Sequence, residues 1–343
     1  MTKQRDGFID IIKIYACILV VLGHFFMSME ASSIIKEVIF IEWFEKTIYY
    51  FHVPLFFICS GYLHQKYSSI NTLADYGNNI RKKSLSLLIP YIVFLSITWL
   101  LKVVFSSSVN AEVNGYFYSL FCEPISPYWY LYALFFIFLI TPTAKSQKNM
   151  FFMLFFALIM KSITFLPFDI SLYPIKTLFM NEIWFVIGMS LSFCNLQKLC
   201  RNKVVLATSF LLLVCFVFIS VAMCLFDISY AWLEFVMGIV ACFTTIVFVI
   251  NIENNSIIKR FDLLCSKYTF PVFLMHTIFA AGIRAVLFKL GIDSAFIHII
   301  CGLSITFIGP VIAYEIMSRI KILDFLLYPN KYLKASSRRM KNV

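Results

Sequence analysis

Residues 10–24 read Asp-Ile-Ile-Lys-Ile-Tyr-Ala-Cys-Ile-Leu-Val-Val-Leu-Gly-His, an apolar run that contains three ionisable side chains. At about 100° per residue, the eleven steps from Lys13 to His24 make about three turns, so both side chains lie on one face of a helix. Asp10 lies within about 60° of that face. The same steps rise about 16 Å, which is roughly half of a bilayer's hydrocarbon core.

Ionisable groups at membrane depth cost about 3 kcal/mol each and normally face a protein interior or a water-filled cavity. The stretch therefore predicts a membrane helix with a functional polar face. A simpler interpretation is also open, in which Lys13 extends to the cytoplasmic interface and His24 only packs near the far end.

The composition indicates an all-α polytopic membrane protein. Of the 343 residues, 61% are hydrophobic and 14% charged, and the mean hydropathy is +0.86, whereas soluble domains are about a quarter charged. The net charge is +11, and the basic residues lie in short loops between apolar runs. This distribution is typical of residues that set the orientation of membrane spans, and it does not predict a nucleic-acid partner. The ten cysteines form no Cys-x-x-Cys pair, so neither a disulfide framework nor a metal site is expected.

Ten apolar spans are expected within a single integral-membrane domain, residues 1–343, with a core of about 5–317 and a basic cytoplasmic tail at 318–343. The spans are 8–27, 45–64, 85–104, 128–142, 150–166, 181–194, 204–225, 230–250, 268–288 and 295–317.

An even number of spans places both termini on one side of the membrane. Lysine and arginine concentrate in the segments that share this side, whereas the opposite loops carry only Lys36, Lys46, Lys176 and Lys289. The positive-inside rule therefore predicts that both termini are cytoplasmic. The N-terminal run carries Asp10 and Lys13 and no cleavage site of small residues follows, so we interpret it as a retained first helix.

The expected second span contains His52, Pro54 and the pair Ser60-Gly61. Pro54 removes a backbone donor and leaves a carbonyl without its helical partner, and Ser60-Gly61 allows a close approach of another helix. The span is either a kinked packing helix or part of a site. The sequence does not place His52 at the depth of His24, so it does not pair the two.

The cationic triplet Arg81-Lys82-Lys83 precedes the third span, and Pro90-Tyr91 follows within it. Such a triplet either enforces topology or holds an anionic cytoplasmic ligand such as a phosphate. Trp129 lies among aromatic residues that open the fourth span, where they form an interfacial belt or stack against a sugar ring.

Three further polar residues lie in later spans. Glu182 starts the sixth span, His276 lies in the middle of the ninth, and Arg284 follows about two turns beyond it. Each is either a packed polar group or a contact to substrate.

Four of these stretches have a familiar order and spacing: Asp10 with Lys13 and His24; Phe51-His-Val-Pro-Leu-Phe-Phe-Ile-Cys-Ser-Gly-Tyr62; Arg81 with Pro90-Tyr91; and Ser266-Lys-Tyr-Thr-Phe-Pro-Val-Phe-Leu-Met-His276. With Pro127-Tyr-Trp-Tyr-Leu131, they resemble the acyltransferase-3 family of integral-membrane acyltransferases, many of which O-acetylate bacterial surface polysaccharides. This chain has Lys13 where the family often has arginine, and Phe273 where tyrosine is frequent.

The resemblance implies a protein of the bacterial cytoplasmic membrane that takes an acyl group, most often acetyl, from cytoplasmic acyl-CoA. The acceptor would be a hydroxyl of a surface polysaccharide or a lipid-linked glycan. We expect Lys13, Arg81, Lys82, Lys83 and Tyr91 to bind the donor, His24 to act as general base, and Asp10 to orient Lys13. The acceptor would meet Ser60, Trp129, Glu182, His276 and Arg284.

Two other classes stay open from the residues alone. A transporter or exporter of a glycan or a small organic acid would also carry polar groups on several spans and a proline-broken helix. A scaffold without chemistry would leave Lys13, His24 and His276 unexplained. The sequence decides neither the acceptor nor the oligomeric state.

Overall fold

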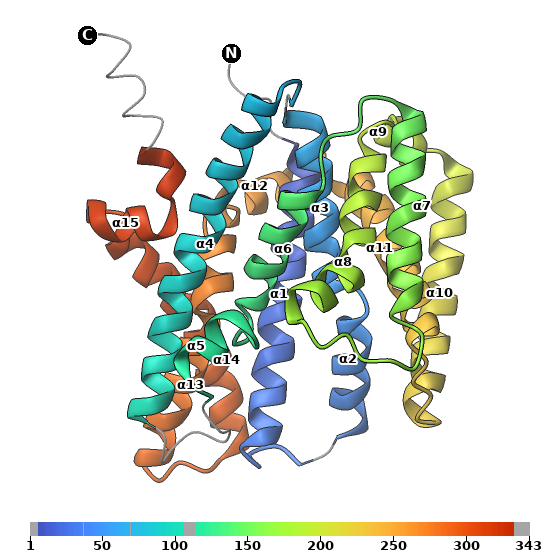
Figure 1. Ribbon diagram of the computed structural model, residues 1–343. Helices are drawn as coiled ribbons and strands as arrows, with labels where there is room; N and C mark the ends of the chain where they lie inside the picture. Colours follow the sequence, from blue (N-terminus) through green and yellow to red (C-terminus); the bar gives the residue numbers. More distant parts are fainter. Residues whose placement is uncertain (1–5, 37, 69, 106–113, 333–343) are drawn as a thin grey trace, which may run out of the picture. The chain divides into compact units, whose positions relative to one another are not determined.

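The computed structural model describes residues 6–36, 38–68, 70–105 and 114–332. These residues form fifteen helices and no strand (Figure 1). In chain order the helices are α1 (Gly7–Ala31), α2 (Ile39–Tyr49), α3 (His52–Tyr67), α4 (Leu73–Val104), α5 (Tyr116–Phe121), α6 (Trp129–Ile140), α7 (Gln147–Ile163), α8 (Tyr173–Leu191), α9 (Leu196–Cys200), α10 (Lys203–Leu225), α11 (Ala231–Ile252), α12 (Ser256–Cys265), α13 (Thr269–Lys289), α14 (Ala295–Met317) and α15 (Lys321–Leu327).

All ten expected spans correspond to helical segments, but the count of ten crossings is not established. Within the described residues, six helices are long and apolar enough to cross a bilayer: α1, α4, α10, α11, α13 and α14. The expected spans 45–64, 128–142, 150–166 and 181–194 correspond to α2 with α3, α6, α7 and α8. The cytoplasmic placement of both termini stays a prediction, and the tail beyond residue 332 lies outside the described residues.

The chain divides into two compact units. The first comprises Met1–Ser68, Thr143–Asp169 and Phe179–Thr269, and the second comprises Ser69–Pro142, Ile170–Leu178 and Phe270–Val343. Each unit is described separately below.

In the first unit, α1 and α3 are antiparallel neighbours. Near the start of α1, the Phe8 ring packs edge-on against Tyr62 at 5.4 Å between centroids. Asp6, which precedes α1, forms an ion pair of 2.8 Å with Lys66 near the end of α3. The hydroxyl of Tyr67 donates to the same carboxylate at 2.6 Å. These contacts join the first turn of α1 to the last turn of α3.

The expected span 45–64 is not one continuous helix, because the chain breaks between α2 and α3 at Tyr50-Phe51. Pro54 lies in the first turn of α3, where its missing N–H costs little, but its ring would clash with the Tyr50 carbonyl in a continuous helix. That carbonyl packs instead against Gly238 of α11, where an added Cβ would lie 2.5 Å away. The thiol of Cys242, one turn along α11, faces the Phe51 carbonyl at 3.9 Å.

Two glycines bring α3 and α8 into backbone contact. A Cβ added to Gly61 would lie 1.9 Å from the Phe185 carbonyl oxygen, and one added to Gly188 would lie 2.0 Å from the Ile58 carbonyl oxygen. The reciprocal pairing shows that the two helices run antiparallel here. The sequence prediction of close approach at Ser60-Gly61 is therefore confirmed at Gly61.

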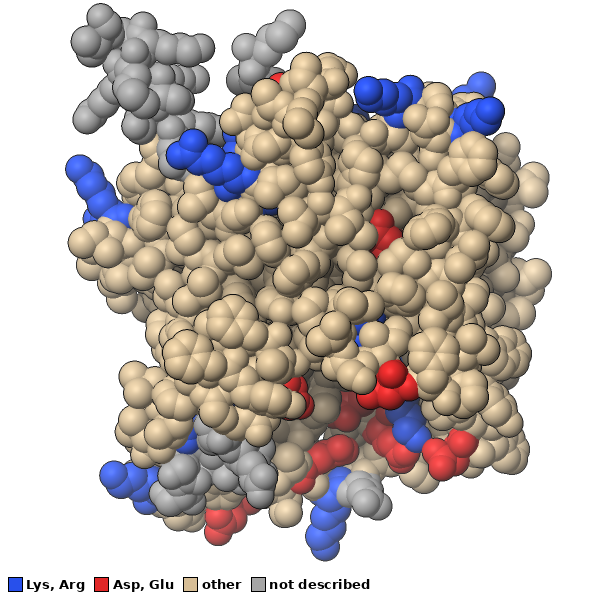
Figure 2. All heavy atoms as spheres, viewed as in Figure 1, with Lys and Arg blue, Asp and Glu red and all other residues tan. Residues whose placement is uncertain are grey.

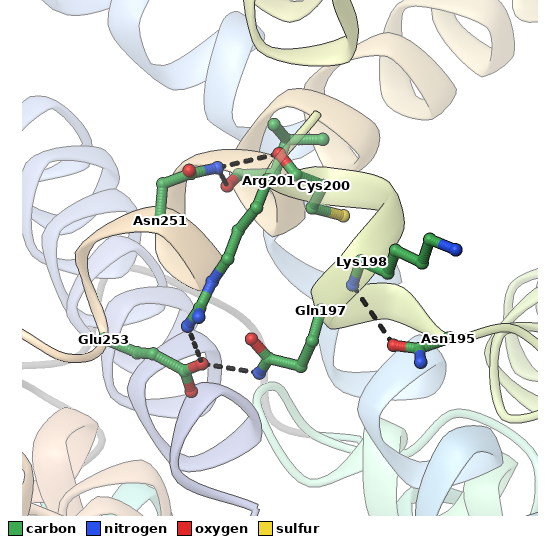
Figure 3. A network of polar contacts seen from close by, with 8 residues as sticks. Asn195, Gln197, Lys198, Cys200, Arg201, Asn251 and Glu253 are labelled. Atoms are coloured by element: carbon green, nitrogen blue, oxygen red, sulfur yellow. Dashed lines mark hydrogen bonds and ion pairs between the residues drawn. The ribbon is translucent and has the colours of Figure 1, made fainter. Parts of the chain in front are cut away.

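Helices α10 and α11 form an antiparallel pair connected by a short turn. At one end, Gln197 and Arg201 bind the Glu253 carboxylate at 2.5 and 3.4 Å, as Figure 3 shows. At the same end, the Asn251 side chain donates to the Cys200 carbonyl at 3.0 Å. At the other end, Lys46 of α2 pairs with Asp227 in the turn at 3.2 Å. These contacts fix α9 and α2 against the pair.

The outer surface of α10 is strongly apolar. Phe210, Leu211 and Phe218 are 68%, 63% and 73% exposed. Large exposed apolar patches on a helix of this length indicate a surface covered by lipid.

The second unit is built around α4, which begins at residue 73, well before the expected span at 85. A capping box fixes the start, because Thr72 accepts from the Asp75 N–H and Asp75 accepts from the Thr72 N–H, each at 3.1 Å. The fully buried Tyr128 hydroxyl joins Thr98 at 2.7 Å and the Leu274 carbonyl at 3.0 Å. Tyr128 thus connects α4 with α13 inside this unit.

Candidate active site

Helix α1 carries the two basic residues singled out from the sequence, and both are partly buried. Asp10 and Lys13 each interact electrostatically with Cys59 on α3. Eleven residues further along α1, His24 interacts electrostatically with His52 at the start of α3. These interactions place the polar face of α1 on the side of the helix that packs against α3.

His52 is a residue that the sequence analysis named but did not pair with His24. Its side chain is only 2% exposed, and its Nδ1 lies 2.6 Å from the Ile48 carbonyl oxygen. The ring of Tyr49 packs edge-on against the imidazole, with 4.8 Å between centroids and an interplanar angle of 87°. Pro54 is the signal that could have indicated this pairing, because it favours a helix break just before His52, and His52 at the start of α3 interacts electrostatically with His24.

Gly23 allows α1 to approach the helix break. A Cβ on Gly23 would lie 2.9 Å from the Ile48 side chain and 3.5 Å from the Tyr49 ring. The adjacent His24 is consequently held beside the α2–α3 junction. The Tyr49 hydroxyl also reaches the Met27 sulfur of α1 at 2.7 Å.

Acidic residues surround the end of the first unit at which α1 and α2 meet. Glu45 of α2 interacts electrostatically with Glu30 of α1, and Glu42 pairs with Lys46 at 2.9 Å. In Figure 2, red atoms gather at the end that carries the loop between α1 and α2 in Figure 1. A cationic or hydroxyl-rich ligand would be favoured at this end over an anionic one.

Two expected acceptor residues also belong to the first unit. Ser60 is partly buried on α3, next to the glycine that contacts α8. Glu182 of α8 is 6% exposed. Ser60 and Glu182 therefore lie on the two helices, α3 and α8, that cross at Gly61 and Gly188. Their contact with a substrate stays a prediction.

The expected donor-binding residues Arg81, Lys82, Lys83 and Tyr91 lie on α4 in the second unit. Arg81 and Lys82 are exposed, whereas the Lys83 ammonium lies 3.8 Å from the centre of the Phe138 ring. Tyr91 is 2% exposed and its hydroxyl donates to the Leu120 carbonyl at 2.6 Å. The Tyr91 side chain packs in the core of the second unit, and donor binding by these four residues stays a prediction.

The remaining expected acceptor residues, Trp129, His276 and Arg284, lie in the second unit. Trp129 is partly exposed at the start of α6, and Arg284 is partly exposed on α13. His276 is 1% exposed, and its Nδ1 lies 2.9 Å from the Phe273 carbonyl. Because a carbonyl only accepts, Nδ1 carries the hydrogen, as it does in His52.

A metal centre is not indicated by the structure. In the part of the chain that is described, no three His, Cys, Asp or Glu residues are grouped so that they could hold an ion.

Comparisons with known proteins, at the level of sequence and of solved structures, give a distant relative. The chain is 27% identical over 141 residues to the nodulation protein NolL of Mesorhizobium japonicum. This match covers 40% of the chain and 36% of NolL, so the chain spans about a third of that relative's length. No solved structure matches the chain.

The family profile described as an acyltransferase domain matches residues 6–315, which include every residue named above as a candidate site residue. The chain belongs to the acyltransferase-3 family and is a multi-pass membrane protein of acyltransferase type.

Proposed function

We propose that this protein is an O-acyltransferase of the bacterial cytoplasmic membrane. The donor is a cytoplasmic acyl-CoA, with acetyl as the simplest acyl group, and the acceptor is a hydroxyl of a cell-surface glycan or of its lipid-linked precursor. The observation that supports this proposal is the position of His24. It is partly buried on α1 and interacts electrostatically with His52 beside the break between α2 and α3, and Lys13 lies about 16 Å away along α1.

The reaction needs one group that both takes and returns a proton. His24 removes the proton from the acceptor hydroxyl while the oxygen attacks the thioester carbonyl. The tetrahedral intermediate then collapses with cleavage of the C–S bond, and the coenzyme A thiolate receives the proton from His24. Histidine suits both steps because its unperturbed pKa lies near neutrality.

Lys13 provides positive charge for the phosphates of the donor. The pantetheine arm would follow α1 from Lys13 to His24 and deliver the thioester to the imidazole. Arg81, Lys82 and Lys83 are proposed as further phosphate contacts on the basis of their charge.

The acceptor residues are proposed from their chemistry. Trp129 offers a face for a sugar ring, and Ser60, Glu182, His276 and Arg284 offer hydrogen-bonding groups. The acidic end of α1 and α2 is compatible with a neutral glycan, since carboxylates accept hydrogen bonds from sugar hydroxyls.

The decisive experiment measures acyl transfer by the purified protein in liposomes with radiolabelled acetyl-CoA and a glycan acceptor. His24→Ala should lower kcat by about 10²- to 10⁴-fold while insertion and thermal stability stay unchanged. Lys13→Ala should raise KM for acetyl-CoA and leave kcat nearly intact. Lys198→Ala, at an exposed lysine outside the site, is the control. A wild-type kcat in His24→Ala would refute the role of His24 as general base.

The break between α2 and α3 favours one other candidate, because transporters place interrupted helices at their substrate sites. The same liposomes distinguish the two classes. A transporter would move the glycan or organic acid across the bilayer without consuming acetyl-CoA.

A further inference from the structure

The joint between α2 and α3 fixes which nitrogen of His52 carries a hydrogen. The Ile48 carbonyl, 2.6 Å from Nδ1, only accepts hydrogen bonds, so Nδ1 is the donor. In the neutral ring Nε2 is then an acceptor. The Phe51 N–H also reaches the Ile48 carbonyl, at 3.2 Å, so the His52 ring completes the end of α2.

The orientation of the ring is fixed as well. Tyr49 packs against its edge, and His52 itself is 2% exposed. Gly23 lies against Ile48 and Tyr49, so α1 approaches the α2–α3 junction closely at the residue that precedes His24. The two imidazoles are close enough to interact electrostatically.

The two histidines differ in exposure. His24 is partly buried, whereas His52 is buried. We propose that His52 is a positioning residue for His24. A ring N–H of His24 donates a hydrogen bond to His52 Nε2. The second ring nitrogen of His24 therefore holds the lone pair that takes the proton of the acceptor hydroxyl. This inference rests on the proposed role of His24 as base.

Loss of such a partner costs orders of magnitude in kcat even where the fold survives, because the base occupies the wrong tautomer or orientation. His52→Asn keeps an amide N–H close to the position of Nδ1 and therefore keeps the bond to Ile48, but it lacks an acceptor at the position of Nε2. His52→Gln provides an oxygen near the position of Nε2. Together, the variants His52→Asn and His52→Gln separate the structural contribution of the His52 ring from its effect on His24.

We expect His52→Asn to lower kcat about 100-fold with an unchanged KM for acetyl-CoA and unchanged thermal stability. His52→Gln should recover at least a part of the rate. In a His24→Ala background, His52→Asn should have no further effect on the residual rate, since it acts only through His24. The control is His298→Gln at a buried histidine whose Nε2 lies 2.7 Å from the Ile292 carbonyl, and it should leave kcat unchanged.

A second measurement does not depend on acyl transfer. Diethyl pyrocarbonate modifies the unprotonated ring nitrogen of histidine, and mass spectrometry of peptides reports the rate at His24. A hydrogen bond to His52 makes that nitrogen more basic, so His52→Asn should slow modification of His24 several-fold, and His52→Gln should restore it in part.

Equal modification rates in wild type and His52→Asn would overturn the inference whether or not the protein transfers acyl groups. An additive loss of rate in the double variant would also overturn it. A wild-type protein that turns over no acyl-CoA, but in which His52→Asn slows modification of His24, would refute the proposed function and leave the pairing of the two rings intact.

Discussion

Replacement of Gly188 by alanine perturbs the crossing of α3 and α8 at the place where the two backbones touch. The added Cβ would lie 2.0 Å from the Ile58 carbonyl oxygen, whereas ordinary van der Waals contact begins at 3.4 Å. The backbones would have to separate by about 1.4 Å, the difference of these two distances.

Such a separation affects the neighbouring core. Phe57 of α3 and Phe185 of α8 are both 0% exposed, and a gap of 0.5–1 Å already removes about a quarter to a half of the dispersion energy of a contact. We expect a loss of about 3 kcal/mol, at the upper end of the usual cost of overpacking a core.

The assay is heat treatment of the detergent-solubilised protein followed by gel filtration. Half of the gel-filtration peak of the folded protein is lost at a characteristic temperature. Gly188→Ala should lower this midpoint temperature by on the order of 5–10 °C. The matched control is Gly77→Ala in α4, where an added Cβ meets no heavy atom within 4 Å. This control should be neutral or slightly stabilising, because alanine restricts the unfolded chain.

The reciprocal glycine gives an internal check. Gly61→Ala should destabilise by a similar amount, and the double variant should lose less than the sum, because the first substitution already opens the crossing. Identical midpoints for Gly188→Ala and Gly77→Ala would contradict the close backbone contact.

Three further outcomes are expected. Tyr128→Phe removes two hydrogen bonds of a fully buried hydroxyl and should cost about 1–3 kcal/mol, measured as a lower midpoint in the same heat assay. Burial raises the pKa of the Asp324 carboxyl, but hydrogen bonds from Lys331 and a neighbouring tyrosine outweigh burial and hold that pKa below its ordinary 3.8. The ion pair's stabilisation is therefore present above about pH 4 and lost below it. Pepsin should cleave the α15 segment of the wild type more slowly than that of Asp324→Asn near pH 4, and the two rates should converge as the pH falls toward 2. A membrane-impermeant maleimide added to intact cells should label the exposed Cys122, and the exposed Cys194 only after permeabilisation; the reverse pattern would invert the predicted topology.

The helices could be predicted because apolar runs and proline positions determine them locally. Pro54 indicated a disturbed helix, and the chain does break, with the Tyr50 carbonyl turned toward Gly238. The start of α4 was predicted too late because a hydropathy pattern detects the apolar part of a helix and not its polar extension, whose start the capping box at Thr72 determines.

The candidate site could be predicted only in part. Helical spacing placed Lys13 and His24 on one face, and that face is turned toward α3. Spacing along one helix carries no information about which residue of another helix lies opposite, so His52 was left unpaired. The same limit applies to Tyr91, whose hydroxyl binds the distant Leu120 carbonyl.

The bond from His52 to the Ile48 carbonyl has a consequence for charge changes inside the protein. An imidazolium donates through both nitrogens, and this bond already uses a nitrogen that donates in the neutral ring. Arrival or departure of a proton at the other nitrogen therefore leaves the α2–α3 joint intact.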